Sequence, residues 1–267
     1  MLRRTLVVAG AIALFGVFAS AAMANHAWGT YHWGRTANPV PLTVIDTTSS
    51  AWTSYVVTAV ADWDSSTVLG LTKTTGTANK RCAAVSGKIQ VCNSTYGNNG
   101  WLGLASIWTA SGTTHIAQAT TKLNDTYFNT STYNNPNEKA HVACQEIGHD
   151  FGLNHQDESG ADFNTCMDYF SNTGTNASST DGTHPNKGDS DQLLCIYDPN
   201  TSGRTLNSTS TTGRAHACTG TGHVDTSNSW SKTGAGLVAR PGSENVLVTH
   251  SGRITKITIV RYANPIH

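Results

Sequence analysis

Charged side chains are scarce in this sequence. Lys, Arg, Asp and Glu make up only 13% of the 267 residues, and the 17 basic side chains are balanced by 17 acidic ones. A nucleic-acid-binding protein needs a basic face, which this balance does not supply, so we expect no nucleic-acid partner. Long apolar runs are scarce too. Beyond the first 24 residues none is long enough to cross a bilayer, and we expect no stable membrane association once that segment is removed.

The first 24 residues have the pattern of a secretory signal peptide. Arg3 and Arg4 provide a positive start, residues 5–21 are apolar or small, and residues 22–24 (Ala-Met-Ala) have the small-x-small pattern that signal peptidase requires. We therefore expect cleavage after Ala24 and a secreted, extracellular protein. An uncleaved membrane anchor is the alternative, but the apolar run is short for a membrane span.

The sequence lacks any Cys-x-x-Cys pair, which argues against a zinc site built from cysteines. It has six cysteines, all after the signal segment, and an even count in an exported chain predicts disulfides. Other pairings are open, but pairing between sequence neighbours predicts Cys82–Cys92, Cys144–Cys166 and Cys195–Cys218.

The distribution of apolar residues predicts a chain with both helices and strands. Helical spacing of aromatic and apolar side chains predicts an amphipathic helix over residues 50–64, and the preceding residues 42–46 have the composition of a strand. Short β-rich runs separated by Gly, Asn and Ser follow. The other expected elements are strands at 68–73, 88–93, 102–109 and 114–123, helices at 138–152 and 189–197, and a closing hairpin of 245–249 and 254–262.

One stretch concentrates the polar groups that a metal site needs, and it reads Gln-Glu-Ile-Gly-His-Asp-Phe-Gly-Leu-Asn-His over residues 145–155. Gln145 and His149 are four residues apart, so on a helix they share one face, with Glu146 beside them. Gly152 can take a left-handed conformation and lets the chain turn sharply, which can return His155 to the same point. Three donors would then converge and leave the fourth position open, as a catalytic zinc site requires.

This stretch resembles the extended zinc motif of the metzincin metallopeptidases, HExxHxxGxxH, with Gln145 in place of the first histidine. The glutamine form is similar to that of some gametolysin-like members. Residues 164–169 (Asn-Thr-Cys-Met-Asp-Tyr) resemble the metzincin Met-turn, with Met167 as the methionine that packs beneath the metal. Residues 104–106 (Leu-Ala-Ser) resemble, more loosely, the matrixin edge strand that lines the substrate cleft. The resemblance covers residues 26–200.

The resemblance implies an α+β fold. Residues 25–200 would form a metzincin (zincin-like) catalytic domain. Its twisted mixed sheet would have five strands, with an active-site helix, a backing helix and a C-terminal helix. Residues 201–267 would form a polar linker and a small β-rich hairpin tail that packs on or extends this domain.

The resemblance also implies an activity, that of a monomeric secreted endopeptidase acting on protein or peptide substrates. One Zn²⁺ would be held by Gln145, His149 and His155, and Glu146 would be the general base that works with a zinc-activated water. The substrate would lie extended against an exposed sheet edge near residues 104–108, adding a strand. A structural Ca²⁺ is left open.

Several alternatives stay open at this point. An amide oxygen is a poorer zinc donor than imidazole, so Gln145 predicts weaker metal affinity. His141 is not expected to replace it, because it lies two helical turns before His149, roughly 12 Å along the axis. Tyr169 is either a packing residue or, as in astacin-like relatives, a group that stabilises the transition state. The competing functions are a catalytically inactive binding protein on the same fold and a surface or carbohydrate-binding protein that acts through its polar tail.

Overall fold

The computed structural model describes residues 27–34, 37–110, 113–158, 160–197, 246–251 and 254–263. The predicted signal peptide, the polar part of the predicted tail before residue 246, and Cys218 lie outside these ranges. No helix within the described ranges is long and apolar enough to cross a membrane.

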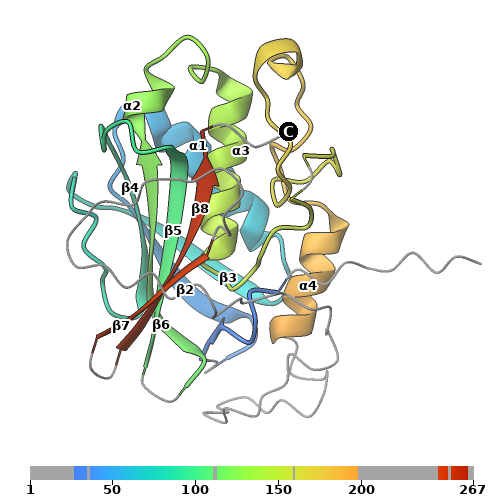
Figure 1. Cartoon of the computed structure of the whole chain (residues 1–267). Helices are drawn as coiled ribbons and strands as arrows, with labels where there is room; N and C mark the ends of the chain where they lie inside the picture. The colour runs from blue at the N-terminus through green and yellow to red at the C-terminus, as the bar shows by residue number, and fades with distance from the viewer. Residues whose placement is uncertain are drawn as a thin grey trace, which may run out of the picture.

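Eight strands form one mixed sheet (Figure 1). Seven follow the order β3-β2-β4-β6-β5-β8-β7, and the short β1 pairs with one end of β6. Strands β3, β2, β4 and β6 pair in parallel, whereas β5 runs antiparallel to both of its neighbours. The bounds are β1 (His32–Trp33), β2 (Val40–Asp46), β3 (Leu69–Thr75), β4 (Lys88–Ser94), β5 (Trp101–Ala110), β6 (His115–Asn124), β7 (Val246–Ser251) and β8 (Ile254–Tyr262).

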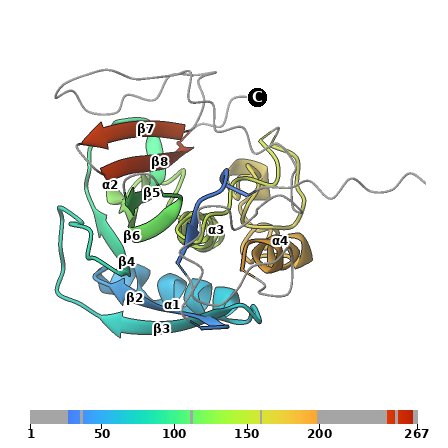
Figure 2. The same cartoon turned by 90° about the horizontal axis from the view of Figure 1, so that it is seen from below.

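The helices of the described residues are α1 (Ser50–Asp64), α2 (Asp125–Phe128), α3 (Pro136–His149) and α4 (Lys187–Tyr197), with a 3-10 turn at Gly174–Asn176. Figure 2 shows α3 between the strands and α4, with α1 beside β2 and β3. Helix α3 contacts α1, β5, β6 and β8. The helix that carries the metal-site motif is therefore held against the antiparallel part of the sheet.

The main core lies between the sheet and helices α1 and α3. Trp63 of α1 is fully buried, and its indole nitrogen donates a hydrogen bond to the Cys144 carbonyl of α3 at 3.0 Å. A Cβ placed on Gly148 would lie 2.6 Å from both the Met167 sulfur and a Trp63 ring carbon. Such close packing is open only to glycine, and burying each large apolar side chain stabilises the fold by roughly 1.5–3 kcal/mol.

The predicted α+β class is confirmed, and every predicted strand and helix is present with its ends within three residues of the prediction. The sheet is larger than the five strands predicted, because β1 and the C-terminal hairpin β7–β8 join the expected set of β2 to β6. The hairpin has apolar residues on both faces. Ile257 and Ile259 enter the main core, while Val260 packs with Trp101 and Leu104 on the other side of the sheet. Pairing within the sheet is what buries both faces of β8.

The prediction of an exposed edge near residues 104–108 is wrong. Leu104 to Trp108 of β5 pair in antiparallel register with Val260 to Lys256 of β8. Strand β5 thus has hydrogen-bonded neighbours on both sides, β6 and β8.

Two of the predicted disulfides are confirmed, Cys82–Cys92 and Cys144–Cys166. Cys195 is also disulfide-bonded, and the partner predicted for it, Cys218, lies outside the described residues. The Cys144–Cys166 bond joins α3, one residue before Gln145, to the loop one residue before Met167. It therefore fixes the position of that loop against the motif helix.

Replacing both Cys144 and Cys166 by Ala should lower the free energy of unfolding by roughly 3 kcal/mol, because the bond closes a loop of sequence separation 22. Urea unfolding measures the loss. Amide hydrogen exchange should also rise in residues 156–170, because their covalent tie to α3 is gone. The matched control removes Cys82 and Cys92, with a similar stability loss but unchanged exchange in that loop. Equal exchange in the two double variants would contradict the assigned role.

Candidate metal centre

Helix α3 begins two residues before the predicted start at residue 138. Pro136 occupies the first turn, where its missing N–H costs no hydrogen bond. The side chain of Asn135 caps the helix by accepting a 2.8 Å hydrogen bond from the Asn137 amide. The same Asn135 side chain donates to the carbonyls of Asn172 and Ala177, so the cap also ties the helix to the loop that follows the Met167 segment.

The helix ends at His149 rather than at the predicted residue 152. The amides of Asp150, Phe151 and Gly152 bond to carbonyls three residues back, so the last turn tightens. Gly152 has φ +89°, and a Cβ there would collide with the Tyr31 carbonyl oxygen. Only glycine fits this turn, as predicted from the sequence.

The turn at Gly152 brings His155 back against His149. Their Nε2 atoms lie 3.1 Å apart. Nδ1 of His149 lies 2.9 Å from the Leu153 carbonyl oxygen, and Nδ1 of His155 lies 3.1 Å from a Glu158 carboxylate oxygen. Because both of these oxygens accept, each Nδ1 carries a proton, and in the neutral rings the two Nε2 lone pairs face one another.

Two lone pairs at this distance repel unless a proton or a cation lies between them. In a tetrahedral zinc site with Zn–N bonds of about 2.0–2.1 Å, two ligand nitrogens lie about 3.3 Å apart. The spacing of His149 and His155 therefore fits two ligands of one ion. The Leu153 carbonyl and Glu158 carboxylate orient the rings from behind, as the outer partners of metal-bound histidines do.

Gln145 lies one helical turn before His149 and is fully buried. Its Nε2 donates a 2.7 Å hydrogen bond to the Asp168 carbonyl, which fixes the amide plane. Its Oε1 has no hydrogen-bond partner among the described residues. A buried oxygen left in this way costs about 1–3 kcal/mol, a cost that coordination of a metal ion would remove.

Within the part of the chain that the structure describes, no three His, Cys, Asp or Glu side chains form a group that could hold a metal ion. The candidate centre has two imidazoles of that set, and the third donor predicted from the sequence, Gln145, is an amide. His141 does not join it. Its ring nitrogens lie instead 3.0 Å from the Asn172 side-chain oxygen and 3.2 Å from the Asp168 carbonyl oxygen, and the single N–H of the neutral ring donates to one of the two.

Glu146 is fully buried against β5. A Cβ on Gly103 would lie 2.5 Å from Glu146 Oε1, so the absence of a side chain there makes room for the carboxyl. Burial raises the pKa of Glu146 well above its usual range. The charge of Arg261 and the backbone amide of Ala105 lower this pKa, whereas the charge of Asp150 raises it further. A raised pKa is what a general base working near neutral pH requires.

Met167 and Tyr169, from the loop that follows α3, pack beside the candidate centre. Met167 is fully buried, with its sulfur against Gly148 of α3. The Tyr169 ring packs on His155 with 4.3 Å between centroids, and its buried hydroxyl has no hydrogen-bond partner among the described residues. Burial raises the pKa of Tyr169 well above its usual value, so the hydroxyl keeps its proton and can act as a donor.

Sequence reasoning missed Arg261 on β8. The side chain is only 1% exposed, and its guanidinium donates to the carbonyl oxygens of Asp168 at 2.8 Å and Phe170 at 2.6 Å. It also lies over the Tyr169 ring, 5.2 Å from the centroid. The available signal was an arginine inside the apolar run of the predicted strand 254–262, since buried arginines are rare without a role.

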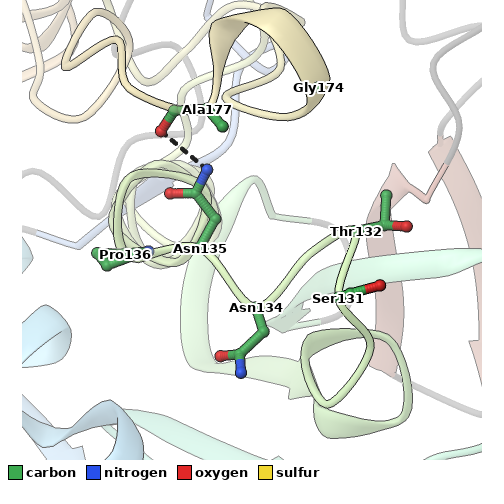
Figure 3. Close-up of a pocket in the computed structure, with 7 residues that line it drawn as sticks. All are labelled: Ser131, Thr132, Asn134, Asn135, Pro136, Gly174 and Ala177. Carbon is green, nitrogen blue, oxygen red and sulfur yellow. Dashed lines mark hydrogen bonds between the residues drawn. The ribbon is translucent and has the colours of Figure 1, made fainter.

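A surface depression lies at the opposite end of α3 (Figure 3). It is lined by small and amide side chains, and Asn135 in its wall is tied to the Ala177 carbonyl. Pro136, in that wall, is 13 residues from His149, which corresponds to about 20 Å along a helix. This depression is therefore separate from the candidate metal centre. Its lining residues are Ser131, Thr132, Asn134, Asn135, Pro136, Gly174 and Ala177.

No protein-family model matches the chain, and no curated protein matches it significantly. The assignment of this site therefore depends on its geometry. That geometry consists of two facing imidazoles, an unpaired amide oxygen and a buried carboxyl, all held within one helix and the turn after it.

Replacing Gln145 by His should tighten zinc binding at least tenfold, because imidazole is the better zinc donor. Gln145→Ala should weaken it. Competition against a chromophoric chelator measures the affinity. Gln118→His, which adds an imidazole on β6 away from the centre, should leave the affinity unchanged. A Gln145→His chain that binds zinc no better than the starting protein would show that residue 145 is not a ligand.

His141 should make stability depend on pH. Burial, helped by Arg261, lowers its pKa from 6.5 to about 3, so it stays neutral when folded while the unfolded chain takes up a proton below about pH 6.5. Stability should therefore fall as the pH drops from about 6.5 towards 3, by up to about 1.4 kcal/mol per pH unit. His141→Gln should flatten this slope in urea unfolding, whereas replacing the exposed His184 should not. An equal dependence of the unfolding free energy on pH in the His141 and His184 variants would contradict this account.

Proposed function

We propose that the chain is a secreted zinc-dependent endopeptidase of the metzincin type. The observation that carries the proposal is the facing pair of Nε2 atoms on His149 and His155, 3.1 Å apart and oriented through their Nδ1 atoms. The buried Met167 beneath α3 agrees with the resemblance of residues 164–169 to a Met-turn. The disulfides agree with an extracellular location.

The side chains at the centre fit a single zinc ion. His149 and His155 would bind through Nε2, and Gln145 would bind through the buried Oε1 that has no other described partner. A zinc ion there would supply a Lewis acid that polarises the scissile carbonyl and acidifies a water molecule. The Asp168 carbonyl, by accepting from Gln145 Nε2, directs the oxygen of that amide away from itself and holds it in one orientation.

Glu146 is the general base of this proposal. It follows Gln145 directly in the helix, and its carboxyl lies against Gly103 of β5. There it takes the proton of the attacking water on a carboxylate oxygen and passes it to the leaving amine. In this proposal the Tyr169 hydroxyl, which is buried beside His155 without a described partner, donates to the carbonyl oxygen as negative charge develops. The substrate is a protein or peptide, and the enzyme acts as a monomer.

A second candidate function is a catalytically inactive binding protein on the same fold. One observation favours it: β8 holds the side of β5 along which a substrate strand would pair. Zinc content and hydrolysis, measured on the same preparation, separate the two functions.

The test uses zinc-loaded full chain, casein as substrate, and a Glu146→Gln variant. The starting protein should hydrolyse casein and lose this activity to a chelator. Glu146→Gln should retain one zinc per chain, measured by elemental analysis, and lose roughly 10²–10⁴-fold in rate. Glu138→Gln, a second buried acid on α3 that bonds to Asn172 instead, should keep its activity. Zinc binding without hydrolysis by the starting protein would favour the binding protein, and activity that survives Glu146→Gln would refute the mechanism.

A further inference from the structure

Strand β8 lies where an extended peptide would bind beside the candidate centre. It pairs antiparallel with β5 from Trp101↔Tyr262 to Ala110↔Ile254. Extended peptides commonly bind by adding a strand to a sheet edge, with main-chain hydrogen bonds for affinity and alternate side chains for specificity. Removing β8 would leave β5 as such an edge, next to α3.

The register places Arg261 at the level of the general base. Its partner across the ladder is Gly103, the residue against which the Glu146 carboxyl packs. Arg261 shares one face of β8 with Ile259 and Ile257, which enter the core. The face that turns towards α3 thus presents the arginine at the level of Gly103, against which the Glu146 carboxyl packs.

The Arg261 pocket is built from main-chain oxygens and an aromatic face. The carbonyls of Asp168 and Phe170 each accept one guanidinium nitrogen, and the ring of Tyr169 lies beneath the plane. This arrangement matches a planar cation with several donors better than a compact ammonium. The Asp168 carbonyl also accepts from Gln145, so the pocket wall is shared with the metal centre.

The pocket holds this cation through main-chain oxygens rather than through a contacting carboxylate. Among the described residues, no carboxylate lies within ion-pair distance of the guanidinium, and Nε of Arg261 has no hydrogen-bond partner. Two carbonyl acceptors and the Tyr169 ring hold the guanidinium at contact distance, and the acids Glu138 and Asp168 act on its charge from further away.

We propose that an extended peptide substrate binds along β5 in the place that β8 occupies. The pocket at Asp168 and Phe170 takes an arginine of this peptide. The hairpin β7–β8 is an internal occupant that the substrate displaces. This inference rests on the proposed peptidase function for its choice of substrate. The hairpin competes by being part of the same chain, which gives it an effective concentration in the millimolar range.

The test measures peptide binding to the full chain with Arg261 replaced by Ala. The probes are a fluorescent peptide with the sequence of residues 254–263 and a twin with Ala in place of its arginine. The Arg261→Ala chain should bind the arginine peptide at least tenfold more tightly than the twin, by fluorescence anisotropy. The starting protein should bind the arginine peptide at least tenfold more weakly than Arg261→Ala does, because its own β8 fills the pocket.

The matched control is Lys256→Ala. Lys256 is the other cation of β8, but it lies over Trp108, 5.1 Å from the ring centroid, rather than in the pocket. This variant should bind the arginine peptide as weakly as the starting protein does. Equal affinity of Arg261→Ala for the two peptides would overturn the arginine pocket, and equal binding by the starting protein and Arg261→Ala would overturn the competition.

A second variant, Arg261→Lys, keeps the test decisive if Arg261→Ala does not fold. Arg261→Lys keeps the charge without the planar fork and should show the same preference for the arginine peptide, to a smaller degree. If neither variant folds, the hairpin is a fixed part of the sheet and the proposal is wrong. Binding is measured on chelated protein and requires no hydrolysis. Selective binding without peptidase activity would therefore overturn the proposed function alone, and hydrolysis without selective binding would overturn this inference alone.

Discussion

The contact between the imidazoles of His149 and His155 is the constraint on which the site depends. Two ring nitrogens approach to 3.1 Å, each ring being fixed from behind by an oxygen acceptor. This approach requires the backbone turn at Gly152, where a side chain would collide with the Tyr31 carbonyl. One glycine therefore links the end of α3 to the geometry of the centre. A cation between the rings turns an unfavourable contact into a ligand pair.

The surrounding fold holds this contact in place through connections from three directions. Helix α1 bonds to the α3 backbone through Trp63, and the Cys144–Cys166 bond fixes the Met167 loop against the same helix. From the sheet, β8 reaches the loop through the guanidinium of Arg261. The Asp168 carbonyl accepts from Gln145 and Arg261, and a ring nitrogen of His141 lies 3.2 Å from it, so one main-chain oxygen joins the helix, the loop and the C-terminal strand.

Much of this could be predicted from the sequence because the signals are local. The helix over 50–64, the closing hairpin and the glycine turn each follow from residue spacing within about fifteen positions, and all three are present. The placement of the hairpin could not be predicted in the same way. Strand pairing between β5 and β8 joins residues about 150 positions apart, and the apolar pattern of β8 shows that it is buried without showing which edge it joins.

The position of β8, which the sequence did not predict, changes the interpretation of strand β5, which it did predict. The expectation of an open edge at residues 104–108 came from the local pattern of one strand, and β8 closes that edge. Arg261, which local patterns did not mark, becomes the residue that connects this closure to Glu146 and Asp168. In our proposal, the chain's own β8 occupies the place along β5 where a substrate strand would bind.

X-ray absorption spectroscopy of the zinc-loaded full chain tests the central claim most directly. The account predicts one zinc ion with two imidazole nitrogens at about 2.0–2.1 Å and oxygen donors completing the shell. Replacing either His149 or His155 should remove one of these imidazoles. A shell containing sulfur, a shell without imidazole, or a spectrum unchanged by both replacements would contradict the proposed centre.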